Sequence, residues 1–234
     1  MVNPIWQEQR AWSTPGVLKY YQSHRQEPRD LYDSERFFLP EMLPQIESVL
    51  DVGCATGGFS RIMRTFNPSL HYTGVDISPV MIDAAQRNYP EHEFKVCDGI
   101  HFPFLPQSFD LVHSSGVLHL NSRYGEMVVA MWQQTRRYLL CDFRLIYSAT
   151  VIGSMQTGFD DSSLDTLPYY VLNIGDHLNF LAALSPAPSR ICAKGYWHSI
   201  ASSANLPFDS VIMTFFLLEK GHGPSVMDLD FNAR

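Results

Sequence analysis

Residues 50–63, LDVGCATGGFSRIM, join an apolar run to an amphipathic helix through a turn rich in glycine. The apolar residues at 48–53 predict a buried strand. The residues after the turn repeat at the spacing of one helix face: Phe59, Ile62, Met63 and Phe66. Glycine is costly unless the backbone turns tightly or approaches another group closely. The segment therefore predicts a strand, a tight turn that faces a ligand, and a helix.

The same alternation of apolar runs and helical periodicity continues along the chain. Further strands are predicted at 71–77, 93–98, 109–115 and 138–146, and apolar stripes predict helices over 78–89 and 124–132. Ser78 and Pro79 suit the N-cap and first position of a helix. Five strand-helix units predict an α/β fold: a doubly wound, Rossmann-like sheet, mostly parallel with an antiparallel edge strand, and helices on both faces.

The two ends of the chain differ from this core. Residues 1–47, rich in Trp, Tyr and Phe, predict an N-terminal helical cover, and residues 48–234 the main domain, the whole forming one compact unit. A helix is expected at 175–184, and two antiparallel edge strands at 189–198 and 209–221. Residues 147–175 are interpreted as an irregular stretch and a possible lid.

Composition limits the partners and the compartment. The chain has 234 residues, 45% hydrophobic and 18% charged, as in globular enzymes, and its net charge of -7 argues against nucleic acid as the partner. No secretory signal or membrane span is evident at its start or within it, so we expect no membrane partner and a cytoplasmic location. The cysteines lack metal-ligand spacing and predict reduced thiols and no metal: Cys54, Cys97, Cys141 and Cys192.

Acids and small residues follow the predicted strands. Ligands of open α/β sheets bind beyond the carboxyl ends of the strands, so these residues are expected to meet at one site: Asp51, Gly53, Asp76, Asp98 and Ser114. The turn G-C-A-T-G-G does not match the dinucleotide pattern G-x-G-x-x-G, and no G-K-[ST] follows as in a phosphate-binding loop. The ligand of this site is therefore expected to be neither a nicotinamide dinucleotide nor a nucleoside triphosphate.

The ordered segments VLDVGCATGGFS, GVDIS, VCDG and FDLVHSSGVLHL resemble the motif series of class I S-adenosylmethionine-dependent methyltransferases of the small-molecule, type 11/12-like kind. The resemblance covers residues 48–120 well and the remaining sheet loosely. It implies S-adenosylmethionine as cofactor, S-adenosylhomocysteine as product, and in-line displacement of the methyl group by an acceptor. The family more often has a glycine where this chain has Ala55, and it often has Leu-x-Pro-Gly-Gly before the fifth strand, which is absent here.

The resemblance assigns a part of the cofactor to each motif. The cofactor-binding residues that it implies are Asp51, Gly53, Cys54, Ala55, Gly57, Asp76, Ile77, Asp98, Gly99, Ile100, Ser114 and Ser115. Asp76 matches the acid that accepts both ribose hydroxyls. Asp98 matches the acid near the adenine amino group, with a simple Asp-Gly turn as the alternative. The motifs around 51–57 and 114–115 match the methionine end.

No universal catalytic residue is expected, because the sulfonium already activates the methyl group and the protein mainly positions the acceptor. His119 is the candidate proton acceptor. Other candidates near the expected cleft are Asp142, Arg144, Tyr20 and Tyr21.

The acceptor pocket is expected to be built from the N-terminal cover, residues 147–175 and a loop at 195–200. Their aromatic residues favour a small apolar or aromatic acceptor. The N-P-P-Y-like signature of base-modifying members is absent after the fourth strand. Two alternatives remain open: a protein or peptide methyltransferase, which needs an open groove, and a protein that binds the cofactor or its product without transferring a methyl group.

Overall fold

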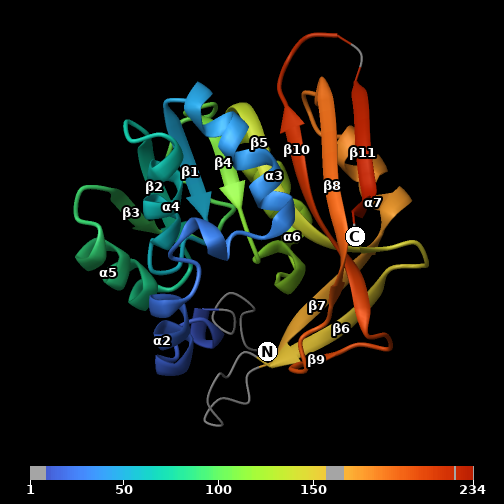
Figure 1. Cartoon of the computed structure of the whole chain (residues 1–234), viewed down its shortest axis with the longest axis horizontal. Helices are drawn as coiled ribbons and strands as arrows, with labels where there is room; N and C mark the ends of the chain where they lie inside the picture. Colours follow the sequence, from blue (N-terminus) through green and yellow to red (C-terminus); the bar gives the residue numbers. More distant parts are fainter. Residues whose placement is uncertain (1–8, 157–165, 224, 234) are drawn as a thin grey trace.

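The computed structural model describes residues 9–156, 166–223 and 225–233. Eight strands form the main path of the sheet: β1 (Ser48–Val52), β2 (His71–Asp76), β3 (Glu93–Val96), β4 (Phe109–Ser114), β5 (Thr135–Ile146), β8 (Arg190–Ser199), β10 (Ser210–Glu219) and β11 (Val226–Ala233). Their order is β11-β8-β10-β5-β4-β1-β2-β3 (Figure 1). Neighbours are parallel except around β10, which is antiparallel to both β5 and β8. The predicted mostly parallel, Rossmann-like sheet is confirmed.

The antiparallel strand lies inside the sheet rather than at its edge. β10 runs from Val211 to Leu218 with apolar residues at every position except Thr214, and almost every side chain is buried, as expected for a strand covered on both faces. β8 and β11 lie beyond it, and β11 forms the edge with exposed residues such as Val226 and Met227. An edge position was therefore wrong for β10.

Three helices connect the first five strands: α4 (Gly58–Phe66), α5 (Pro79–Asn88) and α6 (Tyr124–Gln134). Ser78 is the N-cap of α5, accepting a hydrogen bond from the Met81 amide, and Pro79 is the first helical residue, as predicted. Residues 97–108, between β3 and β4, contain no helix, so the prediction of five complete strand-helix units was wrong there. No helix among the described residues is long and apolar enough to cross a membrane.

Apolar side chains pack on both faces of the sheet. On one face α6 and α7 (Ile174–Ala182) cover a cluster that includes Trp132, Phe143 and Phe216. On the other face α4 and α3 (Asp33–Met42) cover a cluster that includes Leu140 and Phe215. Adjacent residues of β10, Phe215 and Phe216, thus serve opposite cores, as the period of two in a strand requires.

In the described parts of residues 147–175, most residues belong to β-strands. β6 (Val151–Gln156) pairs with β7 (Thr166–Asn173) and with the short β9 (Ala204–Asn205), all antiparallel. A Cβ at Gly153 would lie 2.4 Å from the Asn205 carbonyl oxygen, so this glycine permits strand pairing and does not mark a loop. The irregular stretch was therefore a wrong prediction for 151–156 and 166–173, and residues 157–165, with Gly158, Asp160 and Asp161, lie outside the described residues. The loop expected at 195–200 belongs to β8 as far as Ser199.

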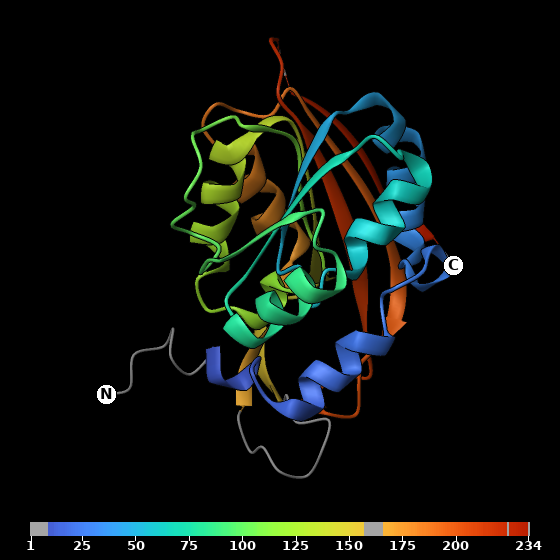
Figure 2. The same cartoon turned by 90° about the vertical axis from the view of Figure 1, so that its left-hand side faces the viewer.

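The N-terminal residues fold across the carboxyl ends of the parallel strands. α2 (Pro15–Ser23) lies below the ends of β1 and β4 in two perpendicular views (Figures 1 and 2). The 3₁₀ helices η1 (Pro28–Asp30) and η2 (Leu43–Gln45) flank α3, whose Leu39 and Met42 belong to the same apolar cluster as Val49 of β1. The cover thus packs on the sheet at the edge where ligands of such folds bind.

Candidate functional site

A cleft of about 940 Å³, including solvent at its mouth, lies at the carboxyl ends of β1, β2 and β4. The predicted residues that line it are Gly53, Cys54, Ala55, Asp76, Ile77, Asp98, Gly99 and Ser115. Further lining residues come from the cover: Trp12, Tyr21, His24, Arg25 and Gln26. The predicted residues Asp51, Gly57, Ile100, Ser114 and His119 do not line it.

The glycine turn adopts the left-handed backbone that the sequence anticipates. Gly53 has φ +82° and Gly57 has φ +83°. A Cβ at Gly53 would lie 2.3 Å from a methyl carbon of Val117, so no other residue fits there. Ala55 also has a positive φ, +46°, which costs about 1–2 kcal/mol for a residue with a Cβ. In this conformation the backbone of residues 53–55 lines the cleft.

Gly58, the first residue of α4, serves a different purpose. A Cβ there would lie 2.4 Å from the carbonyl oxygen of Arg25. Hydrogen bonds also join the cover to this part of the sheet: Thr56 Oγ1 donates to the Tyr21 carbonyl (2.9 Å), and Tyr89 Oη donates to Gln26 Oε1 (2.9 Å). Glycine at this position lets the cover close over the cleft.

We expect Gly58→Ala to destabilise the protein by about 1–3 kcal/mol, although alanine is the better helix former by about 1 kcal/mol. The added methyl group displaces the Arg25 backbone and undocks the cover. Gly125→Ala in α6 is the matched control, because its Cβ would meet only the Phe180 ring, at 3.9 Å. Thermal unfolding measures both. Equal midpoints for the two variants would contradict the role given to Gly58.

Asp76 ends β2 with its carboxylate in the cleft. Oδ1 accepts a hydrogen bond from the Ser78 amide (2.9 Å) and Oδ2 from the Ala55 amide (3.0 Å). Each carboxylate oxygen can accept a second hydrogen bond, so both remain able to receive a hydroxyl group from the cleft. Burial, which outweighs these two donors, raises the pKa of Asp76 to about 6. Because Ser78 caps α5, Asp76 is not needed as the helix cap.

Asp98 both lines the cleft and shapes the turn after β3. Oδ1 accepts from the amides of Ile100 (2.9 Å) and His101 (2.8 Å), and Oδ2 lies 2.7 Å from His101 Nδ1. Burial opposes ionisation, but these donors and the His101 ring lower the pKa of Asp98 overall. Ile100 packs on the α6-side apolar cluster, so it does not form the predicted wall of the cleft. Met81 and Met127, with Ile77, form that wall.

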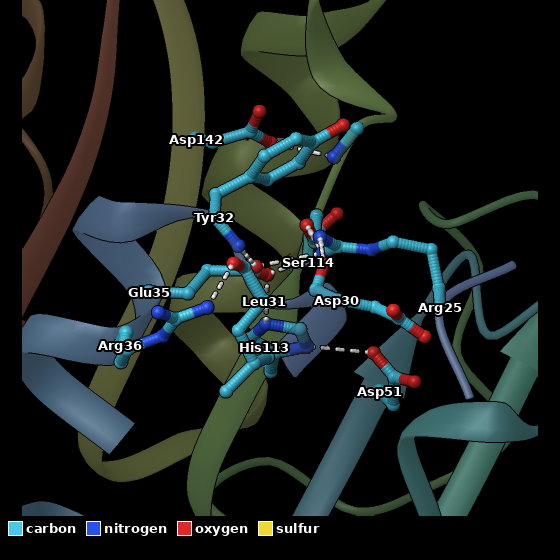
Figure 3. Close-up of polar contacts among 12 residues, drawn as sticks. Arg25, Asp30, Leu31, Tyr32, Glu35, Arg36, Asp51, His113, Ser114 and Asp142 are labelled. Carbon is cyan, nitrogen blue, oxygen red and sulfur yellow. Dashed lines mark hydrogen bonds and ion pairs between the residues drawn. The ribbon is translucent and has the colours of Figure 1, made fainter. Parts of the chain in front are cut away.

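Asp51 lies behind the cleft, in a buried polar cluster (Figure 3). Its Oδ2 accepts a hydrogen bond from Tyr72 Oη (2.5 Å), and its Oδ1 lies 2.8 Å from His113 Nδ1. Burial disfavours a charged imidazole, yet hydrogen bonds and charges from Asp51 and Glu35 raise the pKa of His113 to about 9. The carboxylate of Asp51 is thus used inside the protein. The carboxylate does not line the cleft, and spacing alone did not reveal that a buried histidine lies opposite it.

The predicted residues at and after the end of β4 divide between the interior and the cleft. Ser114 is buried and donates to the Val52 carbonyl (3.0 Å), whereas Ser115 reaches the cleft. His119 is buried against the ring of Tyr169, 4.9 Å between centroids, and its Nδ1 has no hydrogen-bond partner in the described part of the chain. Burial and then the charge of Arg144 keep the pKa of His119 well below its usual value.

The other catalytic candidates divide between the cleft and the interior. Asp142 pairs with Arg144 (2.5 Å) and accepts from the Gly116 amide (2.7 Å), so both lie inside β5 in structural roles. Tyr20 stacks on His24, 4.0 Å between ring centroids, and does not line the cleft. Tyr21 does line it. The lining residues of the cover carry no motif, and only the tertiary fold brings them to the site.

Residues 49–139 match a family model described as a methyltransferase domain. The chain is 36% identical over 66 residues to demethylmenaquinone methyltransferase of Thermotoga maritima, covering 28% of this chain and 29% of that one. It is 30% identical over 157 residues to 2-methyl-6-phytyl-1,4-hydroquinone methyltransferase of Synechocystis sp., covering 53% and 49%. A third relative, probable tRNA methyltransferase 9B of Bos taurus, is 31% identical over 101 residues, covering 43% and 21%. The chain spans less than half the length of each of these relatives.

Solved structures share the fold across most of the chain. Phosphoethanolamine N-methyltransferase 2 of Haemonchus contortus, solved with S-adenosylhomocysteine, aligns with a TM-score of 0.65 and 15% identity, covering 95% of this chain and 61% of that one. The [4+2]-cyclase SpnF aligns with a TM-score of 0.61 and 13% identity, covering 95% and 98%. At these identities the likeness concerns the fold.

The methyltransferase domain matched by residues 49–139, together with the shared fold, supports the predicted class I S-adenosylmethionine-dependent methyltransferase. The cofactor of this class is S-adenosylmethionine, with S-adenosylhomocysteine as the product, as the motif series predicts. The prediction that nucleic acid is not a partner finds no support here, because one relative is named a tRNA methyltransferase.

Proposed function

We propose that this protein transfers the methyl group of S-adenosylmethionine to a small-molecule acceptor. The observation that carries the proposal is the carboxylate of Asp76, which ends β2 inside the cleft with acceptor capacity on both oxygens. A ribose diol needs such a pair of acceptors at one end of a parallel strand.

The chemistry of the lining fits each part of the cofactor. Asp76 would accept from the ribose hydroxyls, and Asp98, with Gly99, would receive the adenine edge. Ile77, Met81 and Met127 offer apolar and polarisable contacts for the ring. The methionine end would lie on the backbone of residues 53–55 and beside Ser115.

The bound cofactor supplies a methyl group already activated on sulfur, so the chain's own task is to hold an acceptor in line and keep water away. Orientation of this kind contributes several kcal/mol to catalysis. Tyr21, Trp12 and His24 lie over the cleft in positions that suit both functions. We do not assign a general base to His119, since its buried ring faces Tyr169 and does not line the cleft.

A small, apolar or aromatic acceptor is favoured over a peptide. The cover crosses the carboxyl ends of the strands (Figure 2), whereas an extended chain would need an open groove there. Aromatic side chains from the cover also suit a flat organic molecule. Two relatives are named for methylation of a hydroquinone and of demethylmenaquinone, which points to the same chemical class.

Transfer of a labelled methyl group from S-adenosylmethionine tests this proposal. The panel contains substituted hydroquinones, a histone-type peptide and bulk tRNA. We expect label in the hydroquinone fraction and none in the peptide or tRNA. Label in tRNA or peptide would overturn the small-molecule assignment, and cofactor binding without transfer to any acceptor would favour a protein that only binds the cofactor.

Cofactor affinity is expected to fall as the pH drops below about 6. The pKa of Asp76, raised by burial to about 6, must drop when ribose hydroxyls donate to the carboxylate, so binding is linked to deprotonation. Affinity is therefore constant above this pKa and falls by up to about tenfold per pH unit below it. Calorimetric titrations with S-adenosylhomocysteine across this range measure the effect. Asp76→Asn should abolish it, and a flat profile in the unaltered protein would remove Asp76 from the ribose site.

A further inference from the structure

A buried histidine joins the cover to the sheet behind the cleft. Nδ1 of His113, in β4, lies 2.8 Å from Asp51 of β1, and its Nε2 lies 3.6 Å from the carboxylate of Glu35 in α3 (Figure 3). The imidazole and both carboxylates are almost completely buried. A separation of 3.6 Å is too long for a good hydrogen bond, so the contact with Glu35 depends on the charge of the imidazole. One proton on His113 thus links the cover with two strands of the sheet.

Four charges alternate behind the cleft. Glu35 also accepts hydrogen bonds from Arg25, whose Nη2 lies 2.7 Å from both carboxylate oxygens. The group formed by Arg25, Glu35, His113 and Asp51 is therefore neutral while His113 carries its proton. Without that proton, two buried carboxylates face a single guanidinium, and an uncompensated buried charge is strongly destabilising.

Neighbouring side chains in the described part of the chain do not supply the missing charge. In β5, the strand beside β4, the charge of Arg144 is already paired with Asp142. The Tyr72 hydroxyl of β2 donates to Asp51, and burial keeps the pKa of Tyr72 well above its usual value, so it stays neutral. Two uncharged rings pack on the imidazole, at 4.8 and 6.4 Å between centroids: Phe59 of α4 and Phe215 of β10.

The two acids differ in their freedom to leave this group. Asp51 belongs to β1, which pairs with β2 on one side and β4 on the other. Glu35 lies in the first turn of α3, in the cover. The later part of α3 is held by apolar contacts, which do not depend on pH: Phe38, Leu39 and Met42. A buried negative charge is therefore relieved most easily by movement of the segment that carries Arg25 and Glu35.

We propose that the proton of His113 holds the cover closed over the cleft, and that its loss lets residues 25–36 move away from the sheet. Arg25 and Gln26 line the cleft, so this movement exposes its interior. Access to the cleft then increases as the pH rises. The coupling does not depend on which acceptor the cleft receives.

The pH range of the effect follows from the two states of the cover. In the closed state, hydrogen bonds and charges from Asp51 and Glu35 outweigh burial and raise the pKa of His113 to about 9. In the open state the ring has lost Glu35 and faces water, so its pKa falls toward the ordinary value of about 6.5. The population of the open state therefore rises with pH, by at most about tenfold per pH unit, and becomes constant above about pH 9.

Cleavage by trypsin after Arg25 measures the opening of the cover. The Arg25 side chain is only 16% exposed and is paired with Glu35, so the protease can bind it only when the segment leaves the sheet. Mass spectrometry follows cleavage of this bond between about pH 6.5 and about pH 9. Each rate is divided by that of an unstructured peptide of the same sequence at the same pH. We expect the normalised rate to rise about tenfold or more over this range, because it follows the population of the open state.

Two variants remove the charge contact, and a third is the control. His113→Asn removes the charge but keeps a donor for Asp51, so cleavage should be fast already at neutral pH and no longer depend on pH. Glu35→Gln removes the partner acid and should flatten the profile in the same way. In His92→Gln the rise should persist, because His92 lies outside the cover, 3.7 Å from Glu91, and burial lowers its pKa.

A normalised rate that stays constant with pH in the unaltered protein would overturn the proposal, as would a rise that persists in a folded His113→Asn or Glu35→Gln variant. The nitrogen chemical shifts of the His113 ring give a second readout, which needs no variant. A ring that is already neutral at neutral pH would contradict its role in holding the cover. Because the digestion uses the protein without added ligand, its result is independent of the proposed cofactor site.

Discussion

Replacing Glu35 with alanine is expected to lower the free energy of unfolding by about 3–5 kcal/mol. The side chain is completely buried, its carboxylate accepts from Arg25 and from the Tyr32 amide (2.8 Å), and it faces His113. Its removal leaves the Arg25 charge without its partner. Urea unfolding followed by circular dichroism measures the change.

Glu91→Ala is the matched control for this prediction. Glu91 pairs with Arg64 at 3.3 Å, but both side chains are about half exposed, so its loss should cost less than about 1 kcal/mol.

The pH dependence of the free energy of unfolding gives a second readout for Glu35→Ala. Because the pKa of His113 is raised to about 9, its contribution to folding stability is complete below about pH 6.5 and is lost as the pH rises through about 9. Glu35→Ala should reduce that loss of stability at alkaline pH. An unchanged alkaline profile together with a small loss of stability would contradict the buried alternation of charges along Arg25, Glu35, His113 and Asp51.

Replacing Asp76 with alanine is expected to weaken cofactor binding at least tenfold. The ribose hydroxyls would lose a charged acceptor, and hydrogen bonds to charged groups are worth about 1.5–3 kcal/mol. The amides of Ala55 and Ser78 would also lose their acceptor, which loosens the floor of the cleft. Calorimetry with S-adenosylhomocysteine at a pH well above 6 measures the loss.

Two further variants separate the ligand contact from the structural one. Asp76→Asn keeps the shape and one oxygen acceptor, so it should fold normally and still bind the cofactor several-fold more weakly. Asp83→Ala removes an exposed acid from α5 and should leave the affinity unchanged. If Asp76→Ala bound the cofactor as tightly as the unaltered protein does, the ribose assignment would be wrong.

Local patterns in the sequence were sufficient to predict most strands of the sheet and the first residues of α5. The stripe at Phe59, Ile62 and Met63 and the Ser78–Pro79 pair report local geometry, and the structure agrees with both. Strand position within the sheet is a tertiary property. β10 was misplaced at the edge, although its nearly all-apolar sequence indicates burial on both faces. Gly153 suggested a loop because the close approach of β9 is invisible in a single sequence.

The residues of the site also divide into those that local position in the sequence reveals and those that depend on tertiary contacts. Asp76 and Asp98 were found because each lies at or just beyond the carboxyl end of a strand, and in a parallel sheet such positions converge. Asp51 also lies near the carboxyl end of its strand, but its partner His113 lies in β4, 62 residues away in sequence. The position of Arg25 in the lining of the cleft depends on how the cover docks against Gly58, which no spacing rule encodes. The cofactor-facing residues of the cover therefore required the structure.

Isothermal titration of the purified protein with S-adenosylmethionine and S-adenosylhomocysteine asks whether this cleft holds the methyl donor. We expect micromolar or tighter binding of both ligands to the cleft formed by the glycine turn, Asp76 and the cover. NADH serves as the comparison ligand, since the turn lacks the dinucleotide spacing. Absence of binding by either sulfur nucleotide, or tighter binding of NADH, would contradict the assignment of this cleft to the methyl-donor cofactor.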